Sequence, residues 1–221
     1  MPAIGGCMEI TWYGHSCFRI TERGMASVVT DPFDSDQVGY SPLKLKAEIV
    51  TVSCDHPGHN FIKAVKGDPH PILGPGEYEI GGVFITGVQT NGHKKKEDEQ
   101  HNTLYVIDYG NLTVVHLGEL MRVPTQTEVE TLGTVNIALV PIGDESSLNA
   151  SKAAEVISLL EPNIVIPMHY ALPESKIKLD PLAKFLKEMG LTQLETMESF
   201  KATGVSGLPE ETKVVVLDRR E

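Results

Sequence analysis

The sequence predicts an α/β fold in which helices pack outside β-sheets. In the first half, apolar residues fall in short runs of strand length separated by turn residues, and helical periodicity is scarce. The second half alternates strand-like runs with helical patterns. A strand-rich half followed by this alternation is typical of sheets covered by helices. With 221 residues, 41% of them hydrophobic, the chain is long enough for one substantial core.

Six runs in the first half have the composition of strands. They are residues 8–20, 25–30, 48–53, 83–90, 103–109 and 112–117. Gly110 and Asn111, between the last two runs, predict a tight turn and therefore a hairpin. Because Met8 begins the first run, we expect residues 1–7 to form a loose tail ahead of a single domain over residues 8–221.

The second half begins with a continuous apolar run, residues 136–142, which predicts a strand covered on both faces. Apolar residues from Ala150 to Ile157 then share one face of a helix that must end before Pro162. Residues 163–167 predict another strand.

A second helix and a last strand complete the predicted elements. Asp180 can cap the helix, Pro181 suits its first position, and apolar residues recur at helical spacing as far as Gly190. Residues 212–218 have the composition of a strand.

Charge and cysteine content narrow the class of function. The net charge of −11 disfavours a large nucleic-acid surface, and Lys94-Lys95-Lys96 is followed by three acidic residues, as in a solvated loop. Three cysteines without repeated spacing argue against a disulfide framework. No segment has the length of an apolar membrane span, and the first residues lack the features of a signal peptide. We therefore expect a cytoplasmic protein with no nucleic-acid or membrane partner, whose oligomeric state the sequence leaves open.

Metal ligands cluster where the third strand-like run ends. Cys54, Asp55, His56 and His59 fall within six positions. Imidazole and thiolate are good ligands for zinc and similar metals. His169 follows another apolar run, and ligand-binding loops of α/β folds gather at such strand ends. The pattern predicts a metal site.

Three further residues each have two interpretations. His116 and Glu119 point to opposite faces if the backbone stays extended, so His116 is either a site residue or a hydrogen-bonded core residue. His15 either lies near the site or is a strand histidine with a satisfied side chain. Cys54 is either a thiolate ligand or nucleophile, or a small residue that packs as a hydrophobe.

An ordered series of motifs resembles the metallo-β-lactamase superfamily, in its lactonase-like branch of uncharacterised metal-dependent hydrolases. The motifs lie at residues 14–18, 30–33, 53–59, 74–80, 116–119 and 167–170. The resemblance covers most of the chain and implies a four-layer αββα sandwich, with two mixed sheets face to face and helices outside. The family's His-x-His-x-Asp-His signature falls on residues 54–59, where Cys54 replaces the first histidine and Gly58 replaces the aspartate.

The resemblance implies a site for divalent metal, most simply zinc, with one or two ions. Its first ion would be held by Cys54, His56 and a histidine of the later loop, His93, with His101 at the far end of that loop as the other candidate. Alone, either loop histidine has the character of a solvated residue.

The second ion would be held by His59 and His169, with Glu119 as a bridging carboxylate in place of the usual aspartate. Because Gly58 donates nothing, we expect partial or mononuclear occupancy. Restoring both positions, by Cys54→His with Gly58→Asp, should then raise the amount of bound metal.

The implied activity is hydrolysis of a small-molecule ester, lactone or phosphodiester by a metal-bound hydroxide. Two other functions stay open. The chain could keep the fold only as a binding module, or Cys54 could act as a nucleophile assisted by His56 or His169. A chelator should abolish the metal-dependent activity, whereas thiol alkylation should abolish the cysteine-dependent one.

Overall fold

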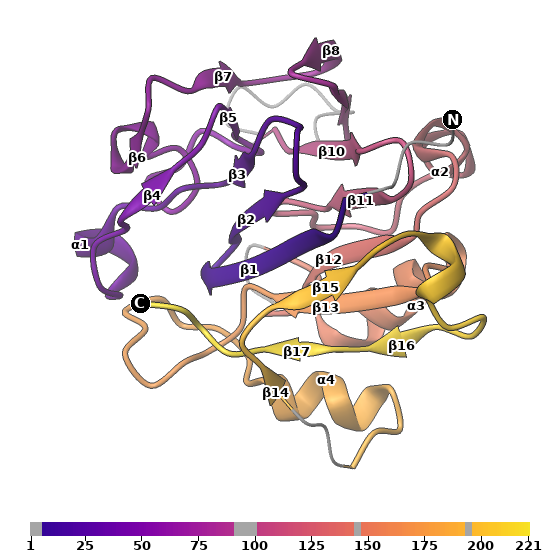
Figure 1. Ribbon diagram of the computed structural model, residues 1–221. Helices are drawn as coiled ribbons and strands as arrows, with labels where there is room; N and C mark the ends of the chain where they lie inside the picture. The colour runs from indigo at the N-terminus through magenta and orange to yellow at the C-terminus, as the bar shows by residue number, and fades with distance from the viewer. Residues whose placement is uncertain (1–5, 91–100, 144–146, 193–195) are drawn as a thin grey trace.

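The computed structural model describes residues 6–90, 101–143, 147–192 and 196–221, and two mixed sheets form its frame (Figure 1). The first sheet has the order β15 (Phe200–Ala202), β1 (Met8–Gly14), β2 (Cys17–Thr21), β3 (Val28–Thr30), β5 (Ile49–Thr51) and β7 (His70–Ile72). The second has the order β16 (Lys213–Val214), β13 (Ile164–Met168), β12 (Ile137–Pro141), β11 (Thr113–His116), β10 (Thr103–Asp108), β9 (Val83–Gln89) and β8 (Gly76–Ile80). Two small pairs are β4 (Leu45–Lys46) with β6 (Val65–Lys66), and β14 (Thr196–Met197) with β17 (Val216–Leu217).

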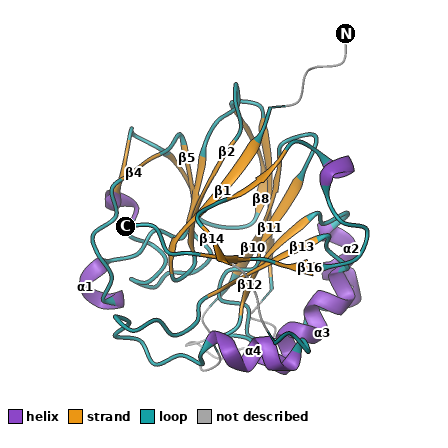
Figure 2. Ribbon diagram, turned by 60° about the horizontal axis from the view of Figure 1, so that its bottom comes forward, coloured by secondary structure: helices purple, strands orange, loops and turns teal. Residues whose placement is uncertain are grey.

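Helices lie on both sides of the strands (Figure 2). On one side are α2 (Gln126–Leu132), α3 (Ala150–Leu160) and α4 (Leu182–Glu188), and on the opposite side is α1 (Ser35–Val38). Single 3₁₀ turns occur at Ile62–Ala64 and Val205–Gly207. The predicted αββα arrangement is confirmed, although the layer outside the first sheet is thin because it consists of the four-residue α1 and loops.

The main core lies between the sheets and continues to the helices. It contains inward residues of both sheets together with one face of α3, including Ala150, Ala153 and Ile157. Every residue of β12 and β13 is buried, as predicted for strands covered on both faces. A second, smaller core packs Val38 of α1 against the outer face of the first sheet.

The run over residues 8–20, expected as one strand, is a hairpin of β1 and β2. Its turn consists of His15 and Ser16, with Gly14 at φ 104° and His15 at φ 52°. Glycine adopts such angles freely, and histidine is enriched among the few other residues that do. The turn therefore reverses the chain in the middle of an otherwise continuous β pattern.

One predicted helix start needs correction, and one helix was not predicted. Pro181 is the N-cap residue of α4 rather than its first helical residue, and the Asp180 carboxylate pairs with Lys184 at 2.6 Å. Helix α2, which was not predicted, begins at a capping box formed by Thr125 and Glu128. Of the predicted tail, residues 1–5 lie outside the described residues.

The carboxyl ends of the parallel strands define the edge where loops gather. Strands β3 and β5 are parallel in the first sheet, and β11, β12 and β13 are parallel in the second. The backbone N–H of Thr103 donates to the carbonyl of Ser53 at 2.8 Å and joins the two sheets at this edge. None of the helices among the described residues is long and apolar enough to span a bilayer.

Candidate metal centre

The loop after β5 folds back on itself through backbone hydrogen bonds. The N–H of His56 donates to the carbonyl of Cys54 at 3.0 Å, and the N–H of His59 donates to that of His56 at 2.8 Å. As a result Cys54, Gly58 and His59 are buried, whereas Asp55 and His56 remain exposed. His56 Nδ1 accepts from the N–H of Gly58 at 3.2 Å.

A buried aspartate orients His59. Asp31 follows β3, and one of its carboxylate oxygens lies 2.8 Å from His59 Nδ1 and accepts from the Ser53 hydroxyl at 2.5 Å. The other oxygen accepts from the Ser53 N–H at 2.7 Å. This leaves His59 Nε2 directed toward the site, as in the carboxylate–histidine pairs that fix metal ligands.

The contact between Asp31 and His59 also shifts the pKa values of both side chains. Burial opposes ionisation of both groups, but the charges of His116 and His59 lower the pKa of Asp31. Burial likewise lowers the pKa of His59, yet neighbouring Cys54 and Asp31 outweigh it and raise that pKa well above the ordinary value. Asp31 and His59 thus each favour the charged form of the other.

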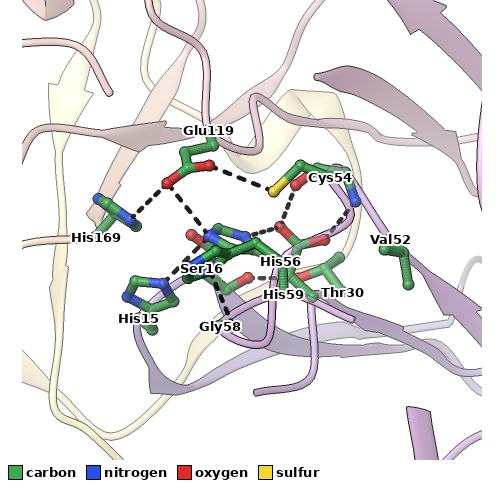
Figure 3. Close-up of polar contacts among 12 residues, drawn as sticks. His15, Ser16, Thr30, Val52, Cys54, His56, Gly58, His59, Glu119 and His169 are labelled. Atoms are coloured by element: carbon green, nitrogen blue, oxygen red, sulfur yellow. Dashed lines mark hydrogen bonds and ion pairs between the residues drawn. The ribbon is translucent and has the colours of Figure 1, made fainter. Parts of the chain in front are cut away.

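Glu119 lies between the ligand candidates of both sheets (Figure 3). One carboxylate oxygen, Oε1, is 3.8 Å from Nε2 of both His59 and His169, and Oε2 accepts from the Cys54 thiol at 3.4 Å. The N–H of Glu119 donates to Oδ1 of Asn102 at 2.7 Å.

Gly118 allows this placement. Its φ is 58°, and a Cβ atom there would lie 2.4 Å from both Asn102 Oδ1 and Ser53 Cβ. Any side chain at position 118 would therefore push the Glu119 loop away from the site.

His169 follows β13 with a left-handed backbone, at φ 54°. A Cβ atom on Gly143 would lie only 2.0 Å from the carbonyl oxygen of His169, so the close approach of these two residues requires glycine at position 143. Nδ1 lies 3.3 Å from the Ser147 hydroxyl, and Nε2 is directed toward Glu119. Burial, reinforced by the charge of His59, lowers the pKa of His169 to about 3, so its imidazole is neutral.

His15 joins the same cluster. Its Nε2 lies 3.2 Å from Nε2 of His59, and its ring centroid is 4.2 Å from that of His169. Burial and the neighbouring histidines, His169 first, lower the pKa of His15 well below the ordinary value. Of its two interpretations, the one that puts it beside the site holds.

Two groups of potential ligands are close enough to hold an ion among the described residues. They are His15, His59 and His169, and Cys54, His59 and Glu119, each with ligand atoms within 4.8 Å of one another. Neighbouring ligands of a tetrahedral zinc ion, at bonds of about 2.0–2.1 Å, lie about 3.3 Å apart. The separations of 3.2 Å and 3.8 Å around His59 Nε2 suit such an ion. Because Nδ1 of His59 is occupied by Asp31, His59 can serve only one ion.

The predicted ligands are only partly brought together. Cys54, His59 and Glu119 form one group of potential ligands, and His169 lies 3.8 Å from Oε1 of Glu119. His56 lies beside His59, with ring centroids 6.2 Å apart, but it is exposed and belongs to neither group. This disagrees with the expectation for a first-ion ligand, because the turn at 54–59 faces His56 outward.

The loop histidines have different outcomes. His93 lies outside the described residues. His101 is exposed, lies 2.8 Å from the Gln89 amide nitrogen through Nδ1, and lines the same cavity as Cys54.

The structure decides between the two interpretations of His116, whereas Cys54 keeps features of both of its own. Burial raises the pKa of the Cys54 thiol, which disfavours the thiolate, but its sulfur belongs to one of the two groups of potential ligands. His116 Nε2 lies 2.9 Å from the carbonyl of Ser16, so its core interpretation is correct. Cys7, Cys17 and Cys54 are all free thiols, as expected.

A cavity of about 560 Å³ opens beside Cys54. It is lined by Val52, Ser53, Cys54, Asp55, Asn60, Ile62, Leu73, Gly74, Pro75, Gln89, His101 and Thr103. Its volume falls in the range of small-molecule sites. Of the two groups of potential ligands, Cys54 lines this cavity, and its thiol contacts Glu119.

Sequence reasoning gave no separate role to Asp31, Asn102 or Ser147. Asp31 lies within the motif at residues 30–33, so its place beside a strand end was an available signal. Asn102 and Ser147 had none, because their contacts with Glu119 and His169 join segments distant in the sequence.

Buried histidines around a carboxylate, at the carboxyl ends of strands in two facing mixed sheets, define the class of metallo-hydrolases with an αββα fold. A family model described as the beta-lactamase superfamily domain matches residues 9–169. The chain therefore belongs to the beta-lactamase superfamily.

Solved structures and relatives agree with this membership. A protein of Thermotoga maritima named as a Zn-dependent hydrolase of the metallo-beta-lactamase superfamily is 34% identical, with a TM-score of 0.77 over 95% of this chain and 98% of that one. A UPF0173 metal-dependent hydrolase of Archaeoglobus fulgidus is 24% identical, over 83% of this chain and 93% of its own length. The metallo hydrolase Igni18 of Ignicoccus hospitalis shares the fold at 19% identity, with a TM-score of 0.65 over 89% of this chain and 98% of its own.

Proposed function

We propose that this chain, a metal-dependent hydrolase by family, uses one divalent ion, zinc, to hydrolyse a small uncharged ester or lactone. The observation that carries the proposal is the Glu119 carboxylate, buried between His59 and His169 and linked by the Cys54 thiol to a cavity of small-molecule size. A zinc ion supplies an activated water and polarises the bond to be broken. Nitrogen and oxygen donors are the ligands of catalytic zinc sites, which fits the residues present.

Each residue has a separate task in this proposal. His59 and His169 would hold the ion through Nε2, and Glu119, whose Oε1 lies 3.8 Å from Nε2 of each, would face the activated water. Asp31 holds the ring of His59 in place through Nδ1. The second oxygen of Glu119 accepts from the thiol of Cys54, which holds the carboxylate in place.

The lining of the cavity favours an uncharged substrate. The described residues that line it include Asp55 but no lysine or arginine, and the whole chain carries a net charge of −11. A phosphodiester would have to enter against this charge. Apolar side chains, among them the exposed Leu73, provide surface for the organic part of an ester or lactone.

The first test measures the dependence of activity on metal. Protein purified without a histidine tag and loaded with zinc should hydrolyse neutral esters or lactones faster than phosphodiesters, and a chelator should stop it. His169→Ala should lower kcat/KM by more than the ~10–100-fold that loss of an outer-shell partner costs. His70→Ala, at an exposed strand residue, is the matched control and should leave the rate unchanged.

The other functions are separate outcomes of this experiment. Activity that survives chelation and His169→Ala but disappears in Cys54→Ser would assign the chemistry to the thiol. Folded protein with neither bound metal nor activity would favour the binding module. Faster turnover of phosphodiesters than of neutral esters would contradict the choice of substrate class.

A further inference from the structure

Gly58, the altered position of the metal-binding signature, lies against the ring of His15. A Cβ atom built on Gly58 would be 2.9 Å from His15 Nε2 and 3.2 Å from His56 Nδ1. Gly58 is not among the described residues with positive φ, so its backbone would accept other residues. Space, rather than conformation, therefore requires glycine at this position.

We propose that His15 takes the place of the missing carboxylate and is the third protein ligand, with His59 and His169, of the single metal ion. This inference deepens the proposed function, because it completes the ligand set of the same site. The His15 ring occupies the volume into which a side chain at position 58 would extend. A ligand lost from the loop after β5 is thus replaced in space by one from the β1–β2 turn.

The three imidazoles are arranged as ligands of one ion would be. Nε2 of His15 and Nε2 of His59 are 3.2 Å apart, near the separation of about 3.3 Å around tetrahedral zinc. The three side chains offer ligand atoms within 4.8 Å of one another and are 0–1% exposed. Oε1 of Glu119 lies 3.8 Å from Nε2 of His59 and of His169, and Figure 3 shows His15, His59, His169 and Glu119 turned toward one another.

The turn that carries His15 is held from both sheets. The carbonyl oxygen of His15 accepts from Trp12 Nε1 at 3.0 Å and from the N–H of His169 at 3.1 Å. The next carbonyl, of Ser16, accepts from Thr30 Oγ1 and from His116 Nε2, each at 2.9 Å. His15 is therefore fixed relative to His169 by a direct backbone bond, and His116 is a positioning residue of the turn.

An ordinary hydrogen-bonded core histidine is the competing explanation for His15. A chain from Asp31 through His59 to His15 would satisfy one ring nitrogen. However, Nδ1 of His15 is buried without a hydrogen-bond partner among the described residues. Ligation through Nε2 would leave Nδ1 unpaired as well, so what favours a ligand is the third imidazole, His169, whose ligand atom lies within 4.8 Å of those of His15 and His59.

A metal titration tests this assignment without any measurement of turnover. Co²⁺ is titrated into metal-free protein made without a tag, and affinity is measured by calorimetry together with the visible absorption of bound Co²⁺. His15→Ala should weaken binding by more than about tenfold and change the absorption spectrum, because a nitrogen ligand is lost. His70→Ala should change neither.

A reciprocal pair of variants covers the case in which His15→Ala merely disturbs folding. Gly58→Asp alone should lower the melting temperature without tighter Co²⁺ binding, because its side chain meets His15. His15→Ala with Gly58→Asp should recover at least about tenfold of the lost affinity, since the carboxylate then enters the vacated space. Unchanged affinity in His15→Ala, or tighter binding in Gly58→Asp with its melting temperature intact, would overturn the proposal.

These results separate the inference from the proposed function. If wild-type protein binds no Co²⁺, both fail. If wild type and His15→Ala bind Co²⁺ equally, only the role of His15 fails. If binding depends on His15 but no ester or lactone is hydrolysed, the ligand assignment stands and the proposed function fails.

Discussion

Five non-glycine residues with positive φ occur in the described chain, and three of them, His15, Asp31 and His169, belong to the site. Such backbone conformations cost about 1–3 kcal/mol each and persist only where surrounding contacts determine them. Here those contacts are present, since the N–H of His169 and the carbonyl of His15 bond to each other and the Asp31 side chain bonds to Ser53. Backbone strain is thus concentrated where side chains must converge.

At the residue scale, the sequence could predict site residues that follow strand-like runs and could not predict one whose direction is set by a turn. His59, Glu119 and His169 follow strand-like runs, so their convergence was predictable. His15 was not, because its direction depends on a turn that interrupts a continuous β pattern. The same geometry changes what we expect of the double variant Cys54→His with Gly58→Asp. The new carboxylate would collide with His15.

Asp31→Asn should weaken both the metal site and the fold. Asp31 is fully buried and accepts from Ser53 and His59, so the variant removes the negative charge beside the buried His59 ring. We expect a loss of about 3–5 kcal/mol in the free energy of unfolding and ~10–100-fold weaker zinc binding. Urea denaturation and calorimetric titration measure the two effects, with Asp36→Asn on the exposed side of α1 as control. Wild-type zinc affinity in Asp31→Asn would contradict the orienting role.

At the scale of elements, buried strands were predicted better than short helices. Strands β12 and β13 have continuous apolar runs, which the sequence displays directly. Helix α2 has only seven residues, and the signal for it is a capping box rather than an apolar stripe. Its stability depends on Glu128, which bonds to Thr125 and to Arg122, and Arg122 in turn bonds to the carbonyl of Thr90 at the end of β9.

Glu128→Gln should destabilise the protein in a pH-dependent manner. The Arg122 guanidinium, with help from Thr125, lowers the pKa of Glu128 from 4.5 to about 2. Because the folded pKa is depressed, the stabilisation is complete above about pH 4.5 and is lost as the pH falls toward 2. Allowing for solvent around the partly exposed Arg122, we expect a loss of about 1–2 kcal/mol near neutral pH.

Urea denaturation measures the difference in free energy of unfolding between wild type and Glu128→Gln at about pH 7 and at about pH 3. At the lower pH this difference should be less than half of its value at the higher pH. Glu155→Gln, at an exposed residue of α3, controls for the general effect of removing a carboxylate. A difference that stays constant with pH would show that the ion pair does not account for the stabilisation.

At the scale of the whole molecule, the site is where the two sheets are joined. His15 and His59 come from the loops of the first sheet, and Glu119 and His169 come from those of the second. The sequence predicted this division only through its resemblance to a known fold, because periodicity identifies strands but does not assign them to sheets. An ion held by His15, His59 and His169 would cross-link segments far apart in the chain.

Zinc should therefore stabilise the entire fold. An ion that binds the folded chain alone, at about 100 times its dissociation constant, adds about 2.7 kcal/mol to the free energy of unfolding. For a chain of 221 residues each kcal/mol raises the melting temperature by about 2–4 °C, so we expect an increase of about 5–10 °C. Differential scanning calorimetry with and without zinc measures it. His169→Ala should lose most of the increase and His70→Ala should keep it, because only the first removes a ligand from the second sheet. An equal increase in all three proteins would mean that zinc binds elsewhere.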